Sequence, residues 1–270
     1  MGTPLPAAPT IGRPAECELT RLRFGSLRWT VRQGANVEAM LRVLQDPEQF
    51  LREPARHIKN SRVVTIARVP PVVPGQGRLI LRRINYGKSL HRVRDFFRPS
   101  RAQRALKNSL LLEQAGVNTP RALAACDVRV LFWPRKAYLI TEEVRGASTL
   151  AALHFHKHGI QRAAAMKVAD LIARLHKNAL SHGDLKWTNI LLDRNSEAWL
   201  IDLDGVEQFA QISESKAQLD MARLGRCFLP YPATLRWSGS RFLKQYCKAL
   251  GKAGEWRAWA EGMIRVLADF

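Results

Sequence analysis

His182-Gly183-Asp184-Leu185-Lys186-Trp187-Thr188-Asn189-Ile190-Leu191-Leu192, followed by Ala198-Trp199-Leu200-Ile201-Asp202-Leu203-Asp204-Gly205, is the stretch that decides the fold of this chain. The apolar runs Ile190 to Leu192 and Trp199 to Ile201 predict two short buried strands. A tight turn across Arg194-Asn195-Ser196 would join them. That return brings Asp202 back toward Asn189.

The spacing suits phosphoryl transfer from ATP. In this reaction the protein mainly positions the reactants and supplies charge that balances the phosphates. We expect Asp184 to meet the acceptor hydroxyl as a base, and Lys186 to supply a point charge for the travelling phosphoryl group. Asn189 and Asp202 offer the oxygen ligands that Mg²⁺ accepts. Taken singly, an aspartate such as Asp184 more often caps the backbone amides of a turn. One such as Asp202 is more often a polar residue that ends a strand. Their order and separation favour catalysis, or a scaffold inherited from it.

The stretch resembles the protein-kinase signature H-R-D-L-x-x-x-x-N followed by D-F-G. Gly183 stands in place of the arginine, and Asp202-Leu203-Asp204 forms the second motif. The resemblance implies an α+β, two-lobed protein-kinase-like fold with a small β-rich N-lobe and a mainly α C-lobe, and ATP with Mg²⁺ as cofactors. We expect residues 1–16 to be a disordered Pro-rich lead, 17–141 to form the N-lobe and 142–270 the C-lobe.

The N-terminal half shows the pattern of a hairpin. Strand-like residues from Arg62 to Val69 precede a Pro- and Gly-rich connection, and Leu79-Ile80-Leu81 resumes the apolar run. In a kinase-like lobe this connection covers the nucleotide phosphates, which makes Gly75 and Gly77 candidate contacts. On local evidence a plain hairpin loop is the better interpretation, and only the downstream motifs favour the phosphate role.

Other nucleotide contacts follow from the same lobe plan. Arg82 follows this apolar run and is a candidate for binding the nucleotide phosphates. The equal alternative is that Arg82 is an exposed residue of the strand with no such role. After the β-rich run Tyr138 to Thr141, Glu142 and Val144 would present backbone groups to adenine.

Helices are predicted around these strands. The expected segments are Asn36 to Leu44, a capping box from Ser100 that opens a helix to Ala115 with Gly116 as its left-handed stop, and an amphipathic helix through Val168, Leu171, Ile172 and Leu175. Asp220 either braces the catalytic loop from a later helix, by analogy with kinases, or is an exposed helix charge.

Composition bounds the partners. The 270 residues carry 43 Lys and Arg against 23 Asp and Glu, a net charge of +20 that implies an anionic partner. The four cysteines show no metal-ligand spacing, and no zinc-finger spacing or aromatic-rich RNA signature is present, so we rank nucleic acid last. Without an apolar run of 18 residues or a signal peptide, we expect a cytoplasmic protein.

A narrower resemblance rests on the order of five segments: Leu79-Ile80-Leu81-Arg82-Arg83, Ser100-Arg101-Ala102, Gly116-Val117-Asn118-Thr119-Pro120-Arg121, Tyr138-Leu139-Ile140-Thr141-Glu142 and Ser181-His182-Gly183-Asp184-Leu185-Lys186. Over roughly residues 55 to 250 the chain resembles the lipopolysaccharide kinase family, bacterial kinase-like enzymes that phosphorylate inner-core sugars, Kdo or heptose. This implies a glycolipid hydroxyl as acceptor, with Asp184 as base and Asn189 and Asp202 as metal ligands.

Two departures from the family pattern motivate alternatives. Arg82 and Arg83 stand where the family has a lysine before an arginine, and the helix after Ser100 has no acidic residue before Glu113. Arginine is not a conservative exchange where geometry is tight. A catalytically impaired kinase-like module that binds an anionic glycolipid or partner is therefore the second hypothesis. A kinase for another small-molecule or protein acceptor is the third.

The charge distribution suggests where an anionic surface would be met. Between Arg78 and Lys107 ten positions are Lys or Arg against the single acid Asp95, with apolar residues interleaved. Such a stretch suits peripheral contact with an anionic membrane, at the inner face of the cytoplasmic membrane, although a solvated charged face is the alternative. The tail, with Trp256 and Trp259, is a weaker candidate. We expect a monomer.

Overall fold

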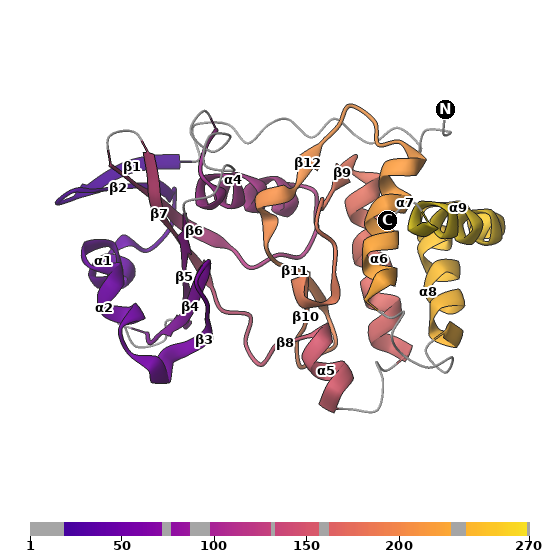
Figure 1. The fold of residues 1–270 in the computed structure, drawn as a ribbon, viewed down its shortest axis with the longest axis horizontal. Helices are drawn as coiled ribbons and strands as arrows, with labels where there is room; N and C mark the ends of the chain where they lie inside the picture. Colours follow the sequence, from indigo (N-terminus) through magenta and orange to yellow (C-terminus); the bar gives the residue numbers. More distant parts are fainter. Residues whose placement is uncertain are drawn as a thin grey trace. The chain divides into compact units, whose positions relative to one another are not determined.

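The computed structural model describes residues 19–71, 77–86, 98–130, 133–156, 162–227 and 236–268. The chain divides into two compact units. The sheet unit comprises Arg13–Leu111 and Pro120–Glu143, and the helical unit includes Leu112–Thr119 and Val144–Phe270. The chain is thus α+β, as predicted, with a sheet-rich and a helix-rich part (Figure 1). The predicted lead of residues 1–16 lies outside the described residues, and the lobe boundary expected between residues 141 and 142 stays a prediction.

The sheet unit is built on one seven-stranded sheet in the order β1-β2-β6-β7-β5-β4-β3, with antiparallel pairing throughout. Its strands are β1 (Leu19–Phe24), β2 (Leu27–Arg32), β3 (His57–Asn60), β4 (Val64–Val69), β5 (Leu79–Asn85), β6 (Ala122–Val130) and β7 (Trp133–Glu142). The β4–β5 pair, with Val64 opposite Ile84 and Val69 opposite Leu79, confirms the predicted hairpin.

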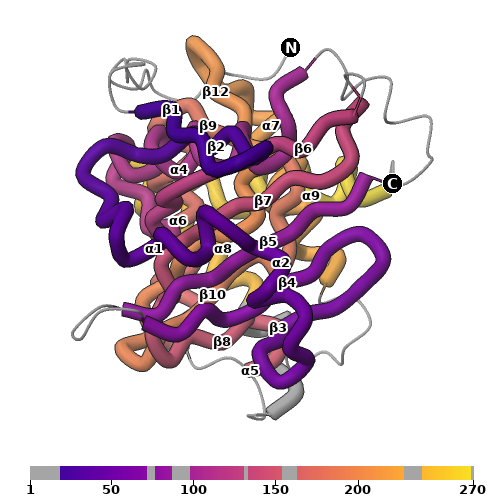
Figure 2. Tube along the Cα trace, turned by 90° about the vertical axis from the view of Figure 1, so that its left-hand side faces the viewer, coloured from indigo at the N-terminus to yellow at the C-terminus, as the bar shows by residue number. Residues whose placement is uncertain are grey.

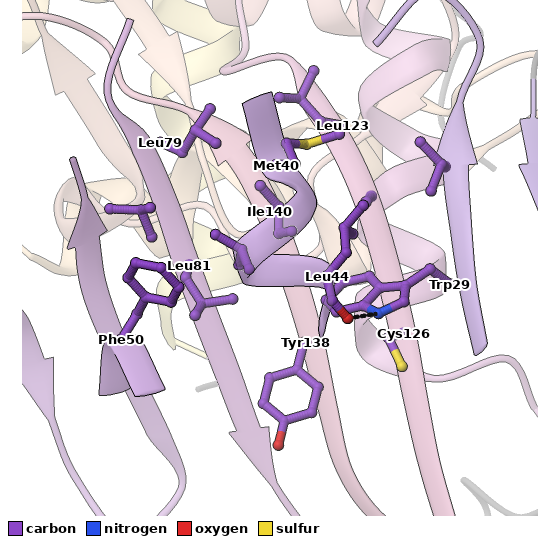
Figure 3. Packing of buried hydrophobic residues seen from close by; sticks show 14 of the residues in the cluster. Trp29, Met40, Leu44, Phe50, Leu79, Leu81, Leu123, Cys126, Tyr138 and Ile140 are labelled. Carbon is purple, nitrogen blue, oxygen red and sulfur yellow. Dashed lines mark hydrogen bonds between the residues drawn. The ribbon is translucent and has the colours of Figure 1, made fainter. Parts of the chain in front are cut away.

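Two helices, α1 (Val37–Gln45) and α2 (Pro47–Leu51), cover one face of this sheet (Figure 2). The predicted helix start is confirmed, because the Asn36 side chain accepts a hydrogen bond from the Ala39 backbone N–H at 3.0 Å. Met40 and Leu44 of α1 are buried against the strands (Figure 3). Burying one such side chain contributes roughly 1.5–3 kcal/mol. The Trp29 indole N–H donates to the Leu44 carbonyl at 2.9 Å, so the ring is buried without losing its polar partner.

The opposite face of the sheet carries the start of α4 (Arg101–Gln114). The Ser100 hydroxyl accepts the Gln103 backbone N–H at 3.1 Å, as the predicted cap requires, and it donates to Asp127 on β6. The Gln103 side chain donates to the Ala125 carbonyl at 3.3 Å, which adds a second link between helix and strand. Gly116, with φ of 64°, is the left-handed stop that the sequence predicted.

Arg82 and Arg83 are directed to opposite faces of β5, because successive residues of a strand alternate. Arg83 reaches the α2 side, where it donates to Glu48 at 2.6 Å and to the Thr65 hydroxyl at 3.2 Å. Glu48 also accepts hydrogen bonds from Lys136 at 2.8 Å and from the Tyr138 hydroxyl at 2.6 Å. One carboxylate thus holds two cations of the basic sheet in place.

The helical unit contains the long helices α6 (Arg162–Lys177), α7 (Glu214–Arg226), α8 (Arg236–Ala249) and α9 (Trp256–Ala268), with the shorter α5 (Leu150–His156). The predicted amphipathic helix is α6, whose residues Val168, Leu171, Ile172 and Leu175 are all buried. Two small sheets complete the unit, one made of β8 (Ser148–Thr149), β10 (Ile190–Leu192) and β11 (Ala198–Leu200), the other of β9 (Leu180–Ser181) and β12 (Glu207–Gln208). No helix in the described ranges has the length and apolarity to cross a membrane.

The Glu48 cluster gives a test of the sheet unit. Burial of Glu48 raises its pKa, but the hydrogen bonds from Lys136 and Tyr138 and the charge of Arg83 outweigh that effect and lower it. Glu48→Ala would leave two neighbouring cations without their shared anion, and we expect the free energy of unfolding to fall by about 1–3 kcal/mol in urea titrations at pH 7. A loss confined to acidic pH would contradict this assignment.

The matched control is Glu53→Ala, because Glu53 forms an exposed ion pair with Arg56. Exposed pairs contribute little, so its free energy of unfolding should change by less than about 0.5 kcal/mol.

Candidate active site

The two short strands predicted from the sequence are β10 and β11, which pair with Ile190 opposite Leu200 and Leu192 opposite Ala198. Beyond this pair, the Ile201 backbone N–H donates to the Asn189 carbonyl at 3.0 Å. The predicted return is therefore confirmed, and it brings the residue before Asp202 into contact with Asn189.

The turn between these strands is held by one side chain. Asp193 accepts the backbone N–H groups of Asn195 at 2.9 Å and Glu197 at 3.0 Å, and its other oxygen accepts the Trp199 indole N–H at 3.2 Å. Ser196, with φ of 60°, takes the left-handed position that closes the turn. The strand pair is thus locked in register by its own turn.

Three of the predicted site residues meet at Asp184, in the loop of residues 181–189, which we call the 181–189 loop. The Lys186 ammonium donates to the Asp184 carboxylate at 2.6 Å. The Asn189 amide N–H donates to the Asp184 backbone carbonyl at 2.9 Å and to its carboxylate at 3.3 Å. With the amide nitrogen used this way, Asn189 presents its carbonyl oxygen as the acceptor on the other side of the amide.

His182 links this loop to the strand before Asp202. The ring is completely buried, and its Nε2 lies 3.1 Å from the Ile201 carbonyl, so that nitrogen carries the proton and donates it. Burial lowers the pKa of His182, against the opposing charges of Asp220, Asp202 and Asp184. The imidazole is therefore neutral at pH 7, because burial outweighs the three carboxylates that favour its protonated form.

The backbone of the loop passes unusually close to the segment of residues 202–205, which we call the Asp202 turn. A Cβ on Gly183, whose φ is 77°, would lie 2.5 Å from the Gly205 carbonyl oxygen, and a Cβ on Gly205 would lie 3.3 Å from the His182 oxygen. The kinase signature has arginine where this chain has Gly183. In this structure glycine is required there by both conformation and space.

Asp202 itself has left-handed backbone angles, φ 65° and ψ 56°. Aspartate tolerates this region better than most residues, but the conformation is still sparsely populated and is maintained by surrounding structure. Strain of this kind is concentrated at functional sites. It is consistent with the metal-ligand role predicted for Asp202, which stays a prediction.

Asp220 on α7 holds the 181–189 loop through hydrogen bonds. The alternative prediction, that Asp220 is an exposed helix charge, is wrong. The side chain is fully buried and accepts the Ser181 hydroxyl at 2.8 Å, the His182 backbone N–H at 2.7 Å and the Gly183 backbone N–H at 3.1 Å. Burial raises the pKa of Asp220, but the neighbouring His176 imidazole, 3.5 Å away, and the hydrogen bonds from Ser181 and the His182 backbone lower it to about 2.

Sequence reasoning missed Arg223, which lies one helical turn after Asp220. Its guanidinium donates to the Gly183 carbonyl and lies 3.6 Å from Asp220. Because residues three apart share a helix face, an acid and a base at this spacing were a usable signal. The pair holds both polar groups of Gly183, the N–H by Asp220 and the carbonyl by Arg223, and so fixes the peptide that leads into Asp184.

The brace continues into the helical unit through buried polar groups. His176 on α6 places Nε2 3.5 Å from Asp220, and its Nδ1 lies 2.6 Å from the Tyr246 hydroxyl on α8. Trp259 on α9 packs edge-on against the Tyr246 ring, with 5.0 Å between centroids. Helices α6 to α9 are therefore all connected to the residue that positions the loop.

The remaining predicted residues belong to other elements. Gly75 is outside the described residues, Gly77 is exposed before β5, and Arg82 is half-buried on β5. Glu142 is the last residue of β7 and forms an ion pair with Arg121 at 3.8 Å. Val144 is the first residue of the segment Val144–Phe270 in the helical unit. Their nucleotide-contact roles stay predictions.

The donor set suits a hard cation shared with phosphates. No group of three His, Cys, Asp or Glu side chains in the described ranges could hold a metal. Asp202 and Asn189 instead offer one carboxylate and one carboxamide, the oxygen ligands that Mg²⁺ accepts when substrate phosphates complete its shell. The residues therefore fit the predicted ion.

The family comparison matches a large part of the chain. A family model described as the lipopolysaccharide kinase (Kdo/WaaP) family matches residues 43–246. Among solved structures, WaaP in complex with acyl carrier protein is similar, with a TM-score of 0.56 and 17% identity, over 90% of this chain and 98% of that one. At this identity the likeness concerns the fold, and it confirms the predicted kinase-like architecture.

Three curated relatives carry the same name. A 3-deoxy-D-manno-octulosonic acid kinase of Vibrio vulnificus (strain YJ016) is 34% identical over 137 residues, 49% of this chain and 56% of that protein. Proteins with the same name from Pasteurella multocida (strain Pm70) and Xylella fastidiosa (strain M12) are 32% and 33% identical, over 50% and 47% of this chain and 59% and 53% of theirs. The chain spans about half the length of the curated relatives it matches.

Gly183→Ala tests the close approach of the loop and the Asp202 turn. Gly251 is the matched control, because its φ of 79° is as unfavourable for alanine while nothing lies within 4 Å of its missing Cβ. Gly251→Ala should cost only the backbone strain, about 1 kcal/mol by thermal unfolding. Gly183→Ala adds the clash with the Gly205 oxygen, so we expect a further 1–2 kcal/mol. Equal losses in the two variants would show that the contact is relaxed in solution.

Asp220→Asn tests the brace. Removing the charge from a fully buried group with four partners should lower the free energy of unfolding by about 3 kcal/mol at pH 7. A depressed pKa stabilises the fold above the unfolded-state value of 3.8, and this stability is lost as pH falls toward 2. The difference between wild type and variant should therefore narrow by about 2 kcal/mol between pH 5 and pH 2.

Asp170→Asn is the control for this experiment, since Asp170 on α6 is half-buried and accepts one bond from Gln245 at 2.7 Å. Loss of this one partly exposed bond should lower the free energy of unfolding at pH 7 by less than about 1 kcal/mol. A constant difference for Asp220→Asn would instead mean that Asp220 is not ionised with a lowered pKa in the folded protein.

Proposed function

Because the chain belongs to the lipopolysaccharide kinase (Kdo/WaaP) family, whose model matches residues 43–246, we propose that it transfers the γ-phosphoryl group of ATP to a sugar hydroxyl of the lipopolysaccharide inner core. The observation that carries this proposal is the convergence of Lys186 and Asn189 on Asp184, beside the strand that leads to Asp202. Kdo is the favoured acceptor over heptose, since the curated relatives are named as kinases of 3-deoxy-D-manno-octulosonic acid.

In the proposed reaction a new bond forms between the sugar oxygen and the γ-phosphorus, and the bond from that phosphorus to the bridging oxygen of ADP breaks. The hydroxyl proton passes to the Asp184 carboxylate, which is half-exposed and so accessible to an acceptor. Lys186 places a positive charge beside the transferred group. Mg²⁺ bound with ATP, held by Asn189 and Asp202, would neutralise phosphate charge.

The positions of these groups depend on backbone that cannot shift easily. Asp220 and Arg223 hold Gly183, and the contact of Gly183 with Gly205 sets the distance between the loop and the Asp202 turn. Preorganised groups of this kind contribute to catalysis because little reorganisation is needed as charge develops.

The acceptor class also suggests the working environment. A lipid-linked sugar acceptor and a net charge of +20 both favour peripheral contact with an anionic membrane surface, with the protein acting as a monomer on the cytoplasmic side.

The second candidate is a catalytically impaired kinase-like module that binds an anionic glycolipid. It is favoured by α4, which has no acidic residue in its first turn, and by Arg83, whose guanidinium is bound to Glu48 and not available to phosphates. Of the two neighbouring arginines, Arg82 is directed to the other face of β5 and is the one left as a candidate phosphate contact. Transfer by the purified protein, to a sugar or to another small-molecule or protein acceptor, would eliminate the impaired module.

The test is transfer of phosphate from ATP to purified Kdo-bearing and heptose-bearing core acceptors, read by mass spectrometry with and without Mg²⁺. Asp184→Asn should reduce transfer at least about 100-fold, because a positioned general base contributes about that much or more. Glu207→Gln, an exposed acid paired with Lys216 at 3.0 Å, should leave transfer unchanged. Undiminished transfer by Asp184→Asn would disprove the role of Asp184, and absence of transfer by wild type to either acceptor would disprove the proposed function.

A further inference from the structure

One end of the seven-stranded sheet gathers three turns that are far apart in the sequence. The β1–β2 turn follows Phe24, the β3–β4 turn follows Asn60 and the β6–β7 turn follows Val130, and the antiparallel register brings all three to the same end. Figure 2 shows this end to the right of the sheet. We call it the turn end.

Apolar side chains are exposed at the turn end. Val130 and Trp133 face each other across the β6–β7 turn and are 49% and 41% exposed. Val63, in the β3–β4 turn, is 54% exposed, and its carbonyl accepts the Asn85 backbone N–H at 2.8 Å at the end of β5. Single exposed apolar residues need no explanation, but these three include a tryptophan and lie at the same end of one sheet. Residues 131 and 132 lie outside the described ranges.

Arginines from six places in the sequence surround them. The exposed arginines at the turn end are Arg23, Arg28, Arg62, Arg98, Arg129 and Arg135. Their placement follows from the strand register and from two bonds: Tyr86 N–H donates to the Arg135 carbonyl at 3.1 Å, and the Arg129 guanidinium lies 3.4 Å from the Arg98 carbonyl. Residues 87–97 of the basic stretch noticed in the sequence lie outside the described ranges, and the described chain resumes at Arg98, whose carbonyl lies near Arg129.

The nearby acids are engaged inside the unit. Glu48 binds Arg83 and Lys136, Asp46 caps the first N–H groups of α2, and Asp127 accepts the Ser100 hydroxyl. Only Arg129 among the six arginines pairs with one of these acids, at 3.9 Å to Asp127. Six exposed arginines against these three acids leave the turn end with a net positive charge.

We propose that the turn end is the surface through which this protein contacts the anionic headgroup face of a phospholipid bilayer. Tryptophan and arginine side chains both suit that position, since each combines an apolar body with a polar tip that stays at headgroup level. Each arginine near an anionic surface contributes about 1 kcal/mol of attraction. The inference rests on the proposed function only in that a lipid-linked acceptor brings the protein to a membrane.

Neither tryptophan of α9 is as exposed as Trp133. Trp259 on α9 is completely buried against Tyr246, and the Trp256 ring is covered by the cations of Lys244 and Arg257, 4.7 and 5.2 Å from its centroid. The weaker candidate from the sequence is therefore wrong as regards Trp259, which serves the helix core.

The experiment is flotation of the full chain with vesicles of phosphatidylcholine alone or with 30% phosphatidylglycerol, a composition chosen for about physiological surface charge. Wild type should bind the anionic vesicles only, and less as salt rises. The double variant Arg129→Gln/Arg135→Gln should lower the partition coefficient about 30-fold, as two charges of about 1 kcal/mol each predict. Trp133→Ser/Val130→Ser should also lower it.

Two matched controls lie on α9. Arg265, whose side chain is 80% exposed, and Ile264, 64% exposed, provide Arg265→Gln and Ile264→Ser, which should bind as wild type does. If these controls lose as much binding as the turn-end variants, or if the turn-end variants lose none, the proposal is overturned in favour of a diffuse charge effect or another surface. Absence of binding by wild type overturns it as well.

Phosphate transfer to a delipidated, water-soluble core oligosaccharide separates this inference from the proposed function. The turn-end variants should transfer to it as wild type does, because they leave the 181–189 loop untouched. A wild type that binds vesicles but transfers no phosphate would remove the proposed function and leave the surface standing. Lower transfer to the soluble acceptor by the turn-end variants would overturn the assignment of this surface to the membrane.

Discussion

The buried carboxylate of Asp220 is the constraint on which the candidate site depends. It accepts the hydroxyl of Ser181 and two successive backbone N–H groups of the 181–189 loop, while Arg223 from the same helix holds the carbonyl of Gly183. A buried charge is tolerated only when such partners surround it. The loop is therefore tied to α7 by groups that would be costly to separate, and through His176 and Tyr246 to α6 and α8.

Glycine at position 183 belongs to the same construction. The Asp202 turn approaches so closely that a side chain at 183 would meet the Gly205 oxygen, and the left-handed conformation at 183 also favours glycine. Where the kinase signature has arginine before the aspartate, this chain uses a backbone contact, and a guanidinium comes instead from Arg223 on α7. The positive charge beside the loop thus comes from a residue distant in sequence, Arg223, and not from the motif itself.

In the sheet unit, charge is distributed by strand alternation. Arg83 is bound by Glu48 on the α2 side, whereas Arg82 is directed to the other face of β5. At the turn end, antiparallel pairing collects arginines that no sequence window contains. The excess of positive charge noted in the composition is therefore not spread evenly, and one region of it is accompanied by exposed tryptophan and valine side chains.

The sequence by itself determined the elements that depend on local rules. These are the β10–β11 pair with its turn, the β4–β5 hairpin, the Asn36 and Ser100 caps, the Gly116 stop and the apolar face of α6, because alternation, capping and helical periodicity act over a few residues. Membership of the kinase-like fold followed from motif order. Only the tertiary structure decided that Asp220 is buried, that Arg223 reaches Gly183, and that the arginines of three turns share one end of the sheet. Those facts depend on contacts between residues distant in sequence, and neither composition nor spacing encodes such contacts in a single chain.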